Sequence, residues 1–357
     1  MSMASGSGYF YTSYRQALAV FDTAFKKQAL FALAIAVALF PLVGSNFQVH
    51  LVNLCFIAVL GALSQNLLIG YAGQVSLGFA GLFAAGGFTA ALIVKELEFS
   101  AFIPVVAAAS AVGAVLGVLV GLPSLRVKGL YLAVSTLALH AVIVYGASEY
   151  QHRLGGSAGI VIPKPSFGPL IIDSDREWYY LLVVVAALTT LACINLVRSR
   201  VGRAWQAIRD RDIVAEACGI PLVRYKLLAF TVSSALAAMA GAIDAYHAGF
   251  VSVEKYSFLL TVQYLAMIVV GGLGSVLGSL LGAFVITLLP FVIDFIVHIF
   301  PTPERLVINI LQLQRIAFGG VIVAVFLLEP RGLVALWERV KSFFQLWPFK
   351  FMVSGLR

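Results

Sequence analysis

Charge is what this sequence lacks most. Only 11% of its 357 residues are Asp, Glu, Lys or Arg, whereas 61% are hydrophobic and the mean hydropathy is +0.99. About a quarter of the residues in a soluble globular domain are charged. The composition therefore excludes an ordinary soluble protein.

Cysteines and catalytic motifs are scarce as well. Three cysteines are too few to indicate a disulfide framework. There is no G-x-x-x-x-G-K-[ST] loop, so we expect the chain by itself to bind no nucleotide in a phosphate loop. The sequence also predicts no metal centre, because its histidines are scattered without metal-ligand spacing: His50, His140, His152, His247 and His298.

Long apolar runs, by contrast, recur along the whole chain. Each is long enough, as a helix, to cross about 30 Å of hydrocarbon. Backbone polar groups in lipid must be satisfied within the segment, so the runs predict an all-α polytopic membrane protein of about ten helices. The expected spans are residues 28–45, 48–70, 74–94, 101–122, 128–147, 178–197, 225–246, 256–272, 275–299 and 306–328.

The distribution of Lys and Arg predicts the orientation of these spans. With the N-terminus in the cytoplasm, ten spans place 17 of the 24 Lys and Arg residues inside and six outside. Cytoplasmic loops carry this excess of positive charge. We therefore expect both termini to be cytoplasmic, with residues 1–27 as a cytoplasmic or interfacial segment, 28–328 as the membrane domain and 329–357 as a tail.

The densest charge lies between Arg198 and Lys226. Val201, Ala204, Trp205 and Ile208 fall on one face of a helix at this spacing, which predicts an amphipathic cytoplasmic helix over about 200–219. Gly219 followed by Pro221 is typical of a helix end. The alternative is a solvated inner loop, although such a loop would not require the apolar face.

Glycine spacing indicates close helix packing at two places. Gly113, Gly117 and Gly121 share a face, as do Gly274, Gly278 and Gly282. Small residues on one face let helix backbones approach closely. Gly-rich runs at 70–87 and 271–275 further predict broken helices, which are tolerated at membrane depth where they line a cavity or are buried in protein.

Polar residues near these breaks are candidates for the substrate pathway, because polar groups inside the membrane are costly. The candidates are Asn66, Gln74, Ser76 and Thr136. An alternative is that they bond backbone groups freed by the glycines. Arg315, in the predicted tenth span, requires a partner or a cavity, and Asp294 is a possible partner.

Five motifs are spread through the chain. They are Gly202-Arg203-Ala204 with Ala207-Ile208-Arg209-Asp210, Ala215-Glu216-Ala217 and Gly219-Ile220; Gly70-Tyr71-Ala72-Gly73-Gln74-Val75-Ser76-Leu77-Gly78; Gly129-Leu130-Tyr131-Leu132-Ala133; Gly271-Gly272-Leu273-Gly274-Ser275; and Pro330-Arg331-Gly332-Leu333. Together they resemble the LivM-type permeases of branched-chain amino-acid ABC importers, and the resemblance covers roughly residues 50–335.

The resemblance implies a multi-pass subunit of a bacterial inner membrane that catalyses no reaction and binds no cofactor. Its expected partners are a second, LivH-like permease, two ATPase subunits that use ATP and Mg, and a periplasmic solute-binding protein. The lipid bilayer surrounds it, and no nucleic acid is expected. The predicted helix at 200–219 would be the coupling helix, which docks on an ATPase subunit, and its ATPase-coupling residues would be Arg203, Trp205, Ile208, Arg209, Asp210, Glu216 and Gly219.

The sequence departs from the family pattern near the expected pathway. Phe79 stands where a His is frequent, and Ser279 stands where a Pro is usual. Because related permeases carry urea, short amides or aromatic carboxylates, the resemblance does not fix the solute. Two other classes remain: a transporter driven by an ion gradient, which requires carboxylates in the spans, and a membrane enzyme, which requires clustered His, Asp or Glu.

Overall fold

The structure is a computed structural model that describes residues 24–98, 100–125, 127, 129–154, 156, 159–167, 170–299, 316, 319–320, 323 and 332–346. Helices account for most of these residues. In chain order they are α2 (Ala24–Val43), α3 (Asn46–Asn66), the π-helix η1 (Leu67–Tyr71), α4 (Phe79–Glu96), α5 (Phe102–Ser124), α6 (Leu130–Leu154), α7 (Asp175–Arg198), α8 (Arg200–Asp210), α9 (Asp212–Ala217), α10 (Leu222–Ala248), the 3₁₀ helix η3 (Val253–Tyr256), α11 (Phe258–Gly271), α12 (Val276–Ile299) and α15 (Leu333–Leu346).

Within the described part of the chain, seven helices are long and apolar enough to cross a membrane. They are α3 continued by η1, then α4, α5, α6, α7, α10 and α12. Seven of the predicted spans are thus confirmed in position, and the chain is a helical, multi-pass membrane protein.

The other three predicted spans have different outcomes. The span expected at 28–45 corresponds to α2, which is not among the seven. The span expected at 256–272 corresponds to α11, whose 14 residues extend only about 21 Å and therefore fall short of the hydrocarbon thickness. The predicted span 306–328, together with Arg315, lies outside the described residues except for four positions.

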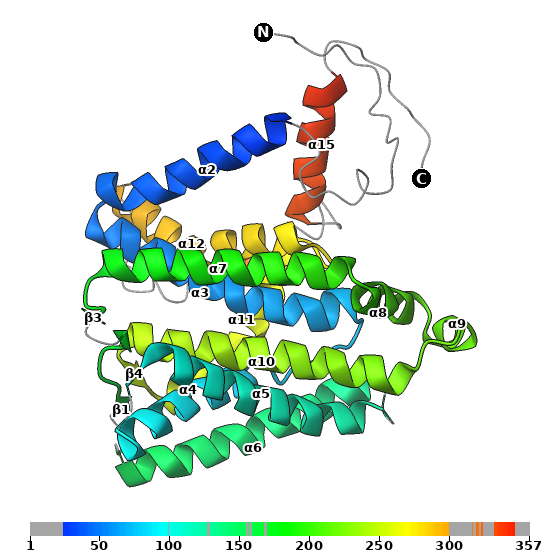
Figure 1. Ribbon diagram of the computed structural model, residues 1–357, viewed down its shortest axis with the longest axis horizontal. Coiled ribbons are helices and arrows are strands. Elements are labelled where there is room, and N and C mark those ends of the chain that lie inside the picture. The colour runs from blue at the N-terminus through cyan, green and yellow to red at the C-terminus, as the bar shows by residue number, and fades with distance from the viewer. Residues whose placement is uncertain are drawn as a thin grey trace.

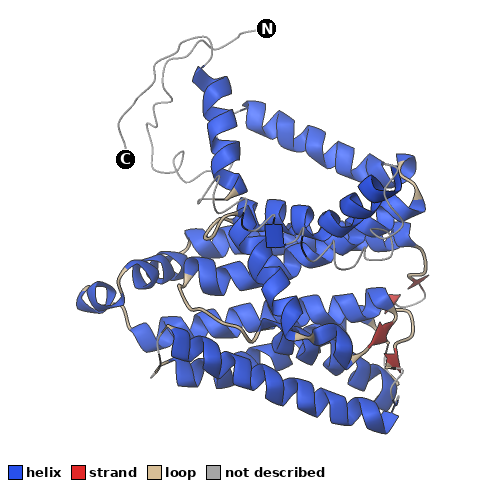
Figure 2. Cartoon of the chain, turned by 180° about the vertical axis from the view of Figure 1, so that it is seen from behind, coloured by secondary structure: helices blue, strands red, loops and turns tan. Residues whose placement is uncertain are grey.

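The long helices lie side by side, so the molecule has two distinct ends (Figure 1). Helices α8 and α9 project at one end, which we name the α8 end. At the opposite end, named the strand end, two pairs of very short strands connect the helices (Figure 2). Strand β1 (Ile160–Val161) pairs antiparallel with β4 (Phe250–Val251), and β2 (Ser166–Phe167) pairs with β3 (Leu170–Ile171).

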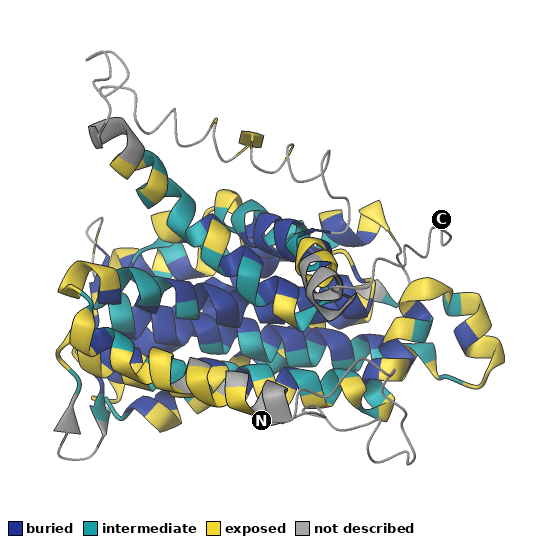
Figure 3. Ribbon diagram, turned by 90° about the horizontal axis from the view of Figure 1, so that it is seen from above, coloured by how far each residue is buried: buried dark blue, intermediate teal, exposed yellow. Residues whose placement is uncertain are grey.

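The centre of the molecule is formed by α3, α4 and α10, and buried residues concentrate there (Figure 3). Glycines let these backbones touch. A Cβ on Gly241 of α10 would lie 1.9 Å from the Phe83 carbonyl oxygen of α4. The face expected from Gly113, Gly117 and Gly121 is confirmed, because all three pack against α10.

The predicted helix 200–219 is divided in the structure. The backbone of Arg211 is extended, with φ −157° and ψ 106°, so α8 ends at Asp210 and the short α9 follows. The expectation of one continuous helix was therefore wrong. Gly219 adopts a positive φ of 82° after α9, which confirms the predicted stop there.

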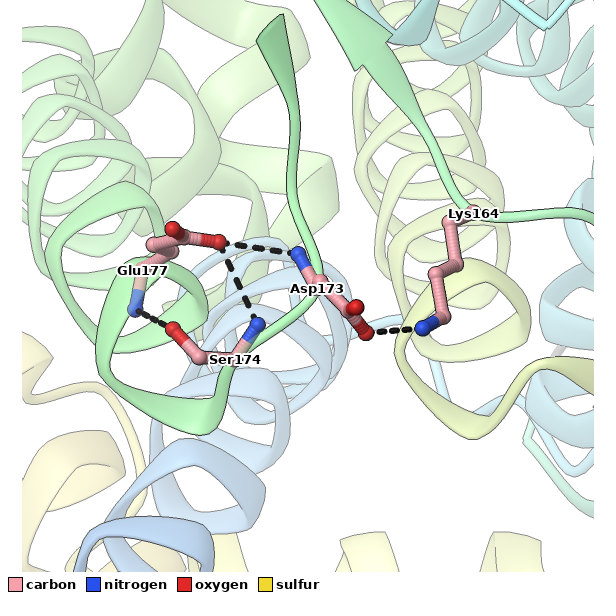
Figure 4. A network of polar contacts seen from close by, with 4 residues as sticks. All are labelled: Lys164, Asp173, Ser174 and Glu177. Atoms are coloured by element: carbon pink, nitrogen blue, oxygen red, sulfur yellow. Dashed lines mark hydrogen bonds and ion pairs between the residues drawn. The ribbon is translucent and has the colours of Figure 1, made fainter.

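Between α6 and α7 the described residues form no α-helix apart from the helix ends and contain the short strands β1, β2 and β3; glycine and proline in this segment disfavour a helix. Ser174 caps α7: its Oγ accepts from the Glu177 amide, and Glu177 Oε2 accepts from the amides of Ser174 and Asp173 at 3.2 and 2.8 Å (Figure 4). Lys164 forms an ion pair with Asp173 beside this cap (Figure 4). These contacts fix where α7 begins at the strand end.

Candidate functional site

Helix α8 packs on the membrane domain through the face that its sequence predicts. Trp205 is fully buried, and its Nε1 donates a hydrogen bond to the Tyr225 carbonyl oxygen at 2.9 Å. Ala204 and Ile208 are buried beside it, whereas Arg203 on the opposite face is exposed. Since indole N–H groups require a partner when buried, this bond fixes α8 to the first turn of α10.

Arg209 connects α8 to two glycine turns. Its Nη1 donates to the carbonyl oxygen of Gly70 in η1. A Cβ on Gly73 would lie 3.0 Å from Arg209 Cγ, and a Cβ on Gly274 would lie 2.5 Å from Nη1. The guanidinium therefore sits between the turn after η1 and the turn before α12, where only glycine leaves room for it.

Asn66 holds the same two turns together from inside the bundle. Its Nδ2 donates to the Ser275 carbonyl oxygen at 2.8 Å and to Ser279 Oγ at 2.7 Å. Its Oδ1 accepts from the Gly274 amide at 2.9 Å. A buried side chain that makes three such bonds connects α3 to the start of α12.

Of the other three candidates for the pathway, Gln74 and Ser76 lie along the chain between η1 and α4, and Thr136 on α6 contacts this segment. Gln74 Nε2 donates to the Ala72 carbonyl oxygen at 3.2 Å, and Ser76 Oγ accepts from the Gly78 amide at 3.3 Å. Thr136 Oγ1, on α6, accepts from the Leu77 amide at 2.9 Å. These bonds satisfy the backbone of a segment that is not helical, and contact with a solute stays a prediction.

A cavity of about 220 Å³ opens beside Arg209 at the α8 end. It is bounded by the Gly73–Val75 segment, the start of α6, and the α8–α9 break from Ile208 to Asp212. Lys226 also lines it, buried and 3.8 Å from Asp212 Oδ2. Four sequence-predicted residues, Gln74, Ile208, Arg209 and Asp210, thus border this cavity, whereas Glu216 and Gly219 are exposed on and after α9.

The strand end holds an ion pair that the sequence does not reveal. Asp244 is buried in α10 with its Oδ2 2.6 Å from Lys255 Nζ in η3, and the Lys255 side chain is 35% exposed. Tyr256 follows in η3, and its burial raises the pKa of its hydroxyl well above the usual value. The group therefore stays protonated at neutral pH. Asp294, by contrast, is exposed on α12.

The sequence matches a known family over most of its length. Residues 48–326 match the family described as branched-chain amino acid transport system / permease component. The chain belongs to this family. The matched segment runs from the third residue of α3 through α12, and hence contains both glycine turns, α8 and Arg209.

Individual members of this permease family are similar at about 30% identity. The high-affinity branched-chain amino acid transport system permease protein LivM of Salmonella typhimurium is 31% identical over 89% of this chain and 77% of its own length. LivM of Escherichia coli is 30% identical with the same coverage. The autoinducer 2 import system permease protein LsrC of Klebsiella pneumoniae is 30% identical over about half of each chain. No solved structure matches the chain.

Proposed function

We propose that this chain is a permease subunit of an ATP-driven importer for branched-chain amino acids or related small polar solutes in a bacterial inner membrane. The LivM relatives and the family match support the class. The similarity to a permease for autoinducer 2 supports a wider choice of solute. The two permease types named LivM and LivH both resemble this chain, LivH at 22% identity, which supports a second permease as its partner.

In this proposal the α8 end faces the cytoplasm. Arg198, Arg203, Arg209 and Arg224 all lie at that end, in accord with the excess of positive charge on cytoplasmic loops. Both termini are then cytoplasmic if ten spans cross the membrane. The strand end would face the periplasm and receive solute from a binding protein.

Two ATPase subunits, which supply the ATP and Mg chemistry, would press on the exposed faces of α8 and α9. The contacts of α8 explain how a push there reaches the pathway. Trp205 makes α8 move with α10, and Arg209 carries the movement to η1 and the turn at Gly274. π-helical turns are frequent at functional sites, and η1 forms the last turn of this span, where Arg209 contacts it.

The single observation that carries this mechanism is the placement of Arg209 between two glycine turns. Because Asn66 already joins α3 to the start of α12, these two helices would move together and open the pathway alternately to either side. Arg203 is expected to contribute less, because the hydrogen bond that its side chain donates goes to the Arg198 carbonyl oxygen at the end of α7 and reaches neither glycine turn.

Arg209→Ala tests the proposal in vesicles that contain both permeases, both ATPases and the binding protein. We expect the complex to assemble but to move about fivefold less solute per ATP hydrolysed, or worse, since coupling free energies of 1–3 kcal/mol correspond to such factors. Arg224→Ala, also an exposed arginine at the α8 end, is the control and should couple normally.

Equal coupling in the two variants would overturn the role of Arg209. Solute uptake with no ATPase present would overturn the importer itself and favour a transporter driven by an ion gradient.

A further inference from the structure

Two histidines that are remote in sequence meet at the strand end. His50, in the first turns of α3, and His247, in the last turn of α10, stack with ring centroids 5.3 Å apart. Asp175, the first residue of α7, places its Oδ1 3.3 Å from His50 Nδ1. Three different helices supply these side chains. Local spacing in the sequence therefore could not reveal that they cluster.

The ligand atoms of these three residues all lie within 4.8 Å of one another. Zinc binds imidazole nitrogen and carboxylate oxygen at about 2.0–2.2 Å, which in a tetrahedron separates neighbouring ligand atoms by about 3.3 Å. The pair His50–Asp175 already has this separation. The third ligand requires an inward movement of at most about 1.5 Å, which side-chain rotation can supply.

Two buried atoms beside this group lack a hydrogen-bond partner among the described residues. They are Nε2 of His247 and Oδ1 of Asn53. Asn53 lies one turn after His50, and its Nδ2 donates to the Asp175 carbonyl oxygen at 2.9 Å. A buried imidazole nitrogen with no partner is costly in a purely structural cluster, whereas a metal ion would satisfy it.

The surroundings also suit an ion. The side chains of His50 and Asp175 are 44% and 39% exposed, so an ion can enter from solvent. Trp178 packs edge-on against His247 and restricts its ring. Lys255 is a cation near His247, but Asp244 lies 2.6 Å from it and offsets its charge. The Lys255–Asp244 pair therefore repels a metal ion bound at His247 only weakly.

We propose that His50, Asp175 and His247 form a binding site for a divalent transition-metal ion such as Zn²⁺. Two imidazoles and one carboxylate are typical ligands of Zn²⁺, Ni²⁺ and Cu²⁺, and they do not suit Mg²⁺ or Ca²⁺. The bound ion joins α3, α7 and α10 at the strand end and opposes their separation. The inference does not depend on which solute the permease carries.

Calorimetric titration of the purified full-length chain with Zn²⁺ tests this site. Cys218 is an exposed free thiol that could bind zinc, so the titration uses the Cys218→Ser background and an affinity tag without histidine. We expect one saturable site for Zn²⁺ and none for Mg²⁺. His247→Ala should weaken binding at least tenfold, because losing even an outer partner of a metal site costs about 10–100-fold.

His152→Ala is the matched control, since His152 is an exposed histidine near the same end on α6. It should bind zinc like the parent. If His247→Ala fails to fold, Asp175→Asn serves instead, because Ser174 rather than Asp175 caps α7. Zinc should also raise the thermal unfolding midpoint of the parent and leave that of His247→Ala, or of Asp175→Asn in its place, unchanged. The proposal would be overturned if the parent showed no saturable zinc binding, or if His247→Ala or Asp175→Asn bound zinc as tightly as the parent.

Discussion

Helices α3 and α6 have nearly the same mean hydropathy, 1.9 and 1.8, yet 78% of the apolar window of α3 is buried and only 28% of that of α6. The two most apolar spans, α12 and α5, are only 28% and 39% buried. Because lipid is as apolar as a leucine side chain, hydropathy rewards exposure to lipid and burial in protein equally. It predicts that a helix spans a membrane and does not predict what the helix touches.

Glycine does not separate the two helices either. Gly61 on α3 faces the ring of Tyr264, and a Cβ there would lie 2.3 Å from its Cε1. Gly146 on α6 has no neighbour within 4 Å of such a Cβ among the described residues. Close packing therefore requires glycine at position 61 of α3, whereas no described neighbour requires it at position 146 of α6.

Valine at two glycines should give the largest contrast between the central and peripheral helices. In Gly241→Val the new Cβ meets the Phe83 carbonyl oxygen, and backbone cannot move aside as a side chain can. We expect the loss of stability to reach at least about 3 kcal/mol, the upper part of the range for overpacked cores. Size-exclusion chromatography of the detergent-solubilised chain should show aggregation or loss of the folded species.

Gly146→Val is the control for this substitution and should elute and unfold like the parent. The added side chain there enters open space, and valine is a slightly better helix former than glycine. A stable, monodisperse Gly241→Val would show that α4 and α10 are not in the contact described here.

Asn66→Ala tests whether polar contacts hold the central helices as firmly as glycine contacts do. The substitution removes three hydrogen bonds and leaves the Gly274 amide and Ser279 hydroxyl without this partner. We expect a loss of about 2–3 kcal/mol, since stranded buried polar groups cost 1–3 kcal/mol. Thermal unfolding in detergent measures it. Asn195→Ala, on an exposed position of α7, should unfold at the parent temperature, and an equal loss in both would refute the special role of Asn66.

Much of this fold could be predicted from the sequence because the membrane restricts the choices. Lipid allows helices and little else, so the apolar runs predicted seven confirmed spans, and the face of Gly113, Gly117 and Gly121 was assigned to packing correctly. The break at Arg211 was missed because neither Gly nor Pro marks it. Residues 208–214 contain no helix breaker, and the contact of Lys226 with Asp212 acts only in the folded chain.

The candidate site was predictable in part. The periodicity of α8 predicted the buried positions of Trp205 and Ile208, because an amphipathic face is a local property. The partners of Asn66 could not be predicted, since they are more than 200 residues away. The meeting of His50, Asp175 and His247 has the same origin: helix ends from three segments converge, and local spacing carries no trace of it.

Substitution of two leucines of α7 should give the smallest change in stability. It compares a buried and an exposed position within one helix. Leu182 is fully buried against the central helices, whereas Leu188 is 62% exposed. Leu182→Ala should cost about 1–2 kcal/mol, below the 2–5 kcal/mol of soluble cores, because in lipid only packing is lost and no transfer from water is regained. Leu188→Ala should change the unfolding midpoint by less than the equivalent of about 0.5 kcal/mol. A larger loss of stability in Leu188→Ala than in Leu182→Ala would mean that Leu188 contacts a partner subunit rather than lipid. That larger loss should then appear only when the second permease is present.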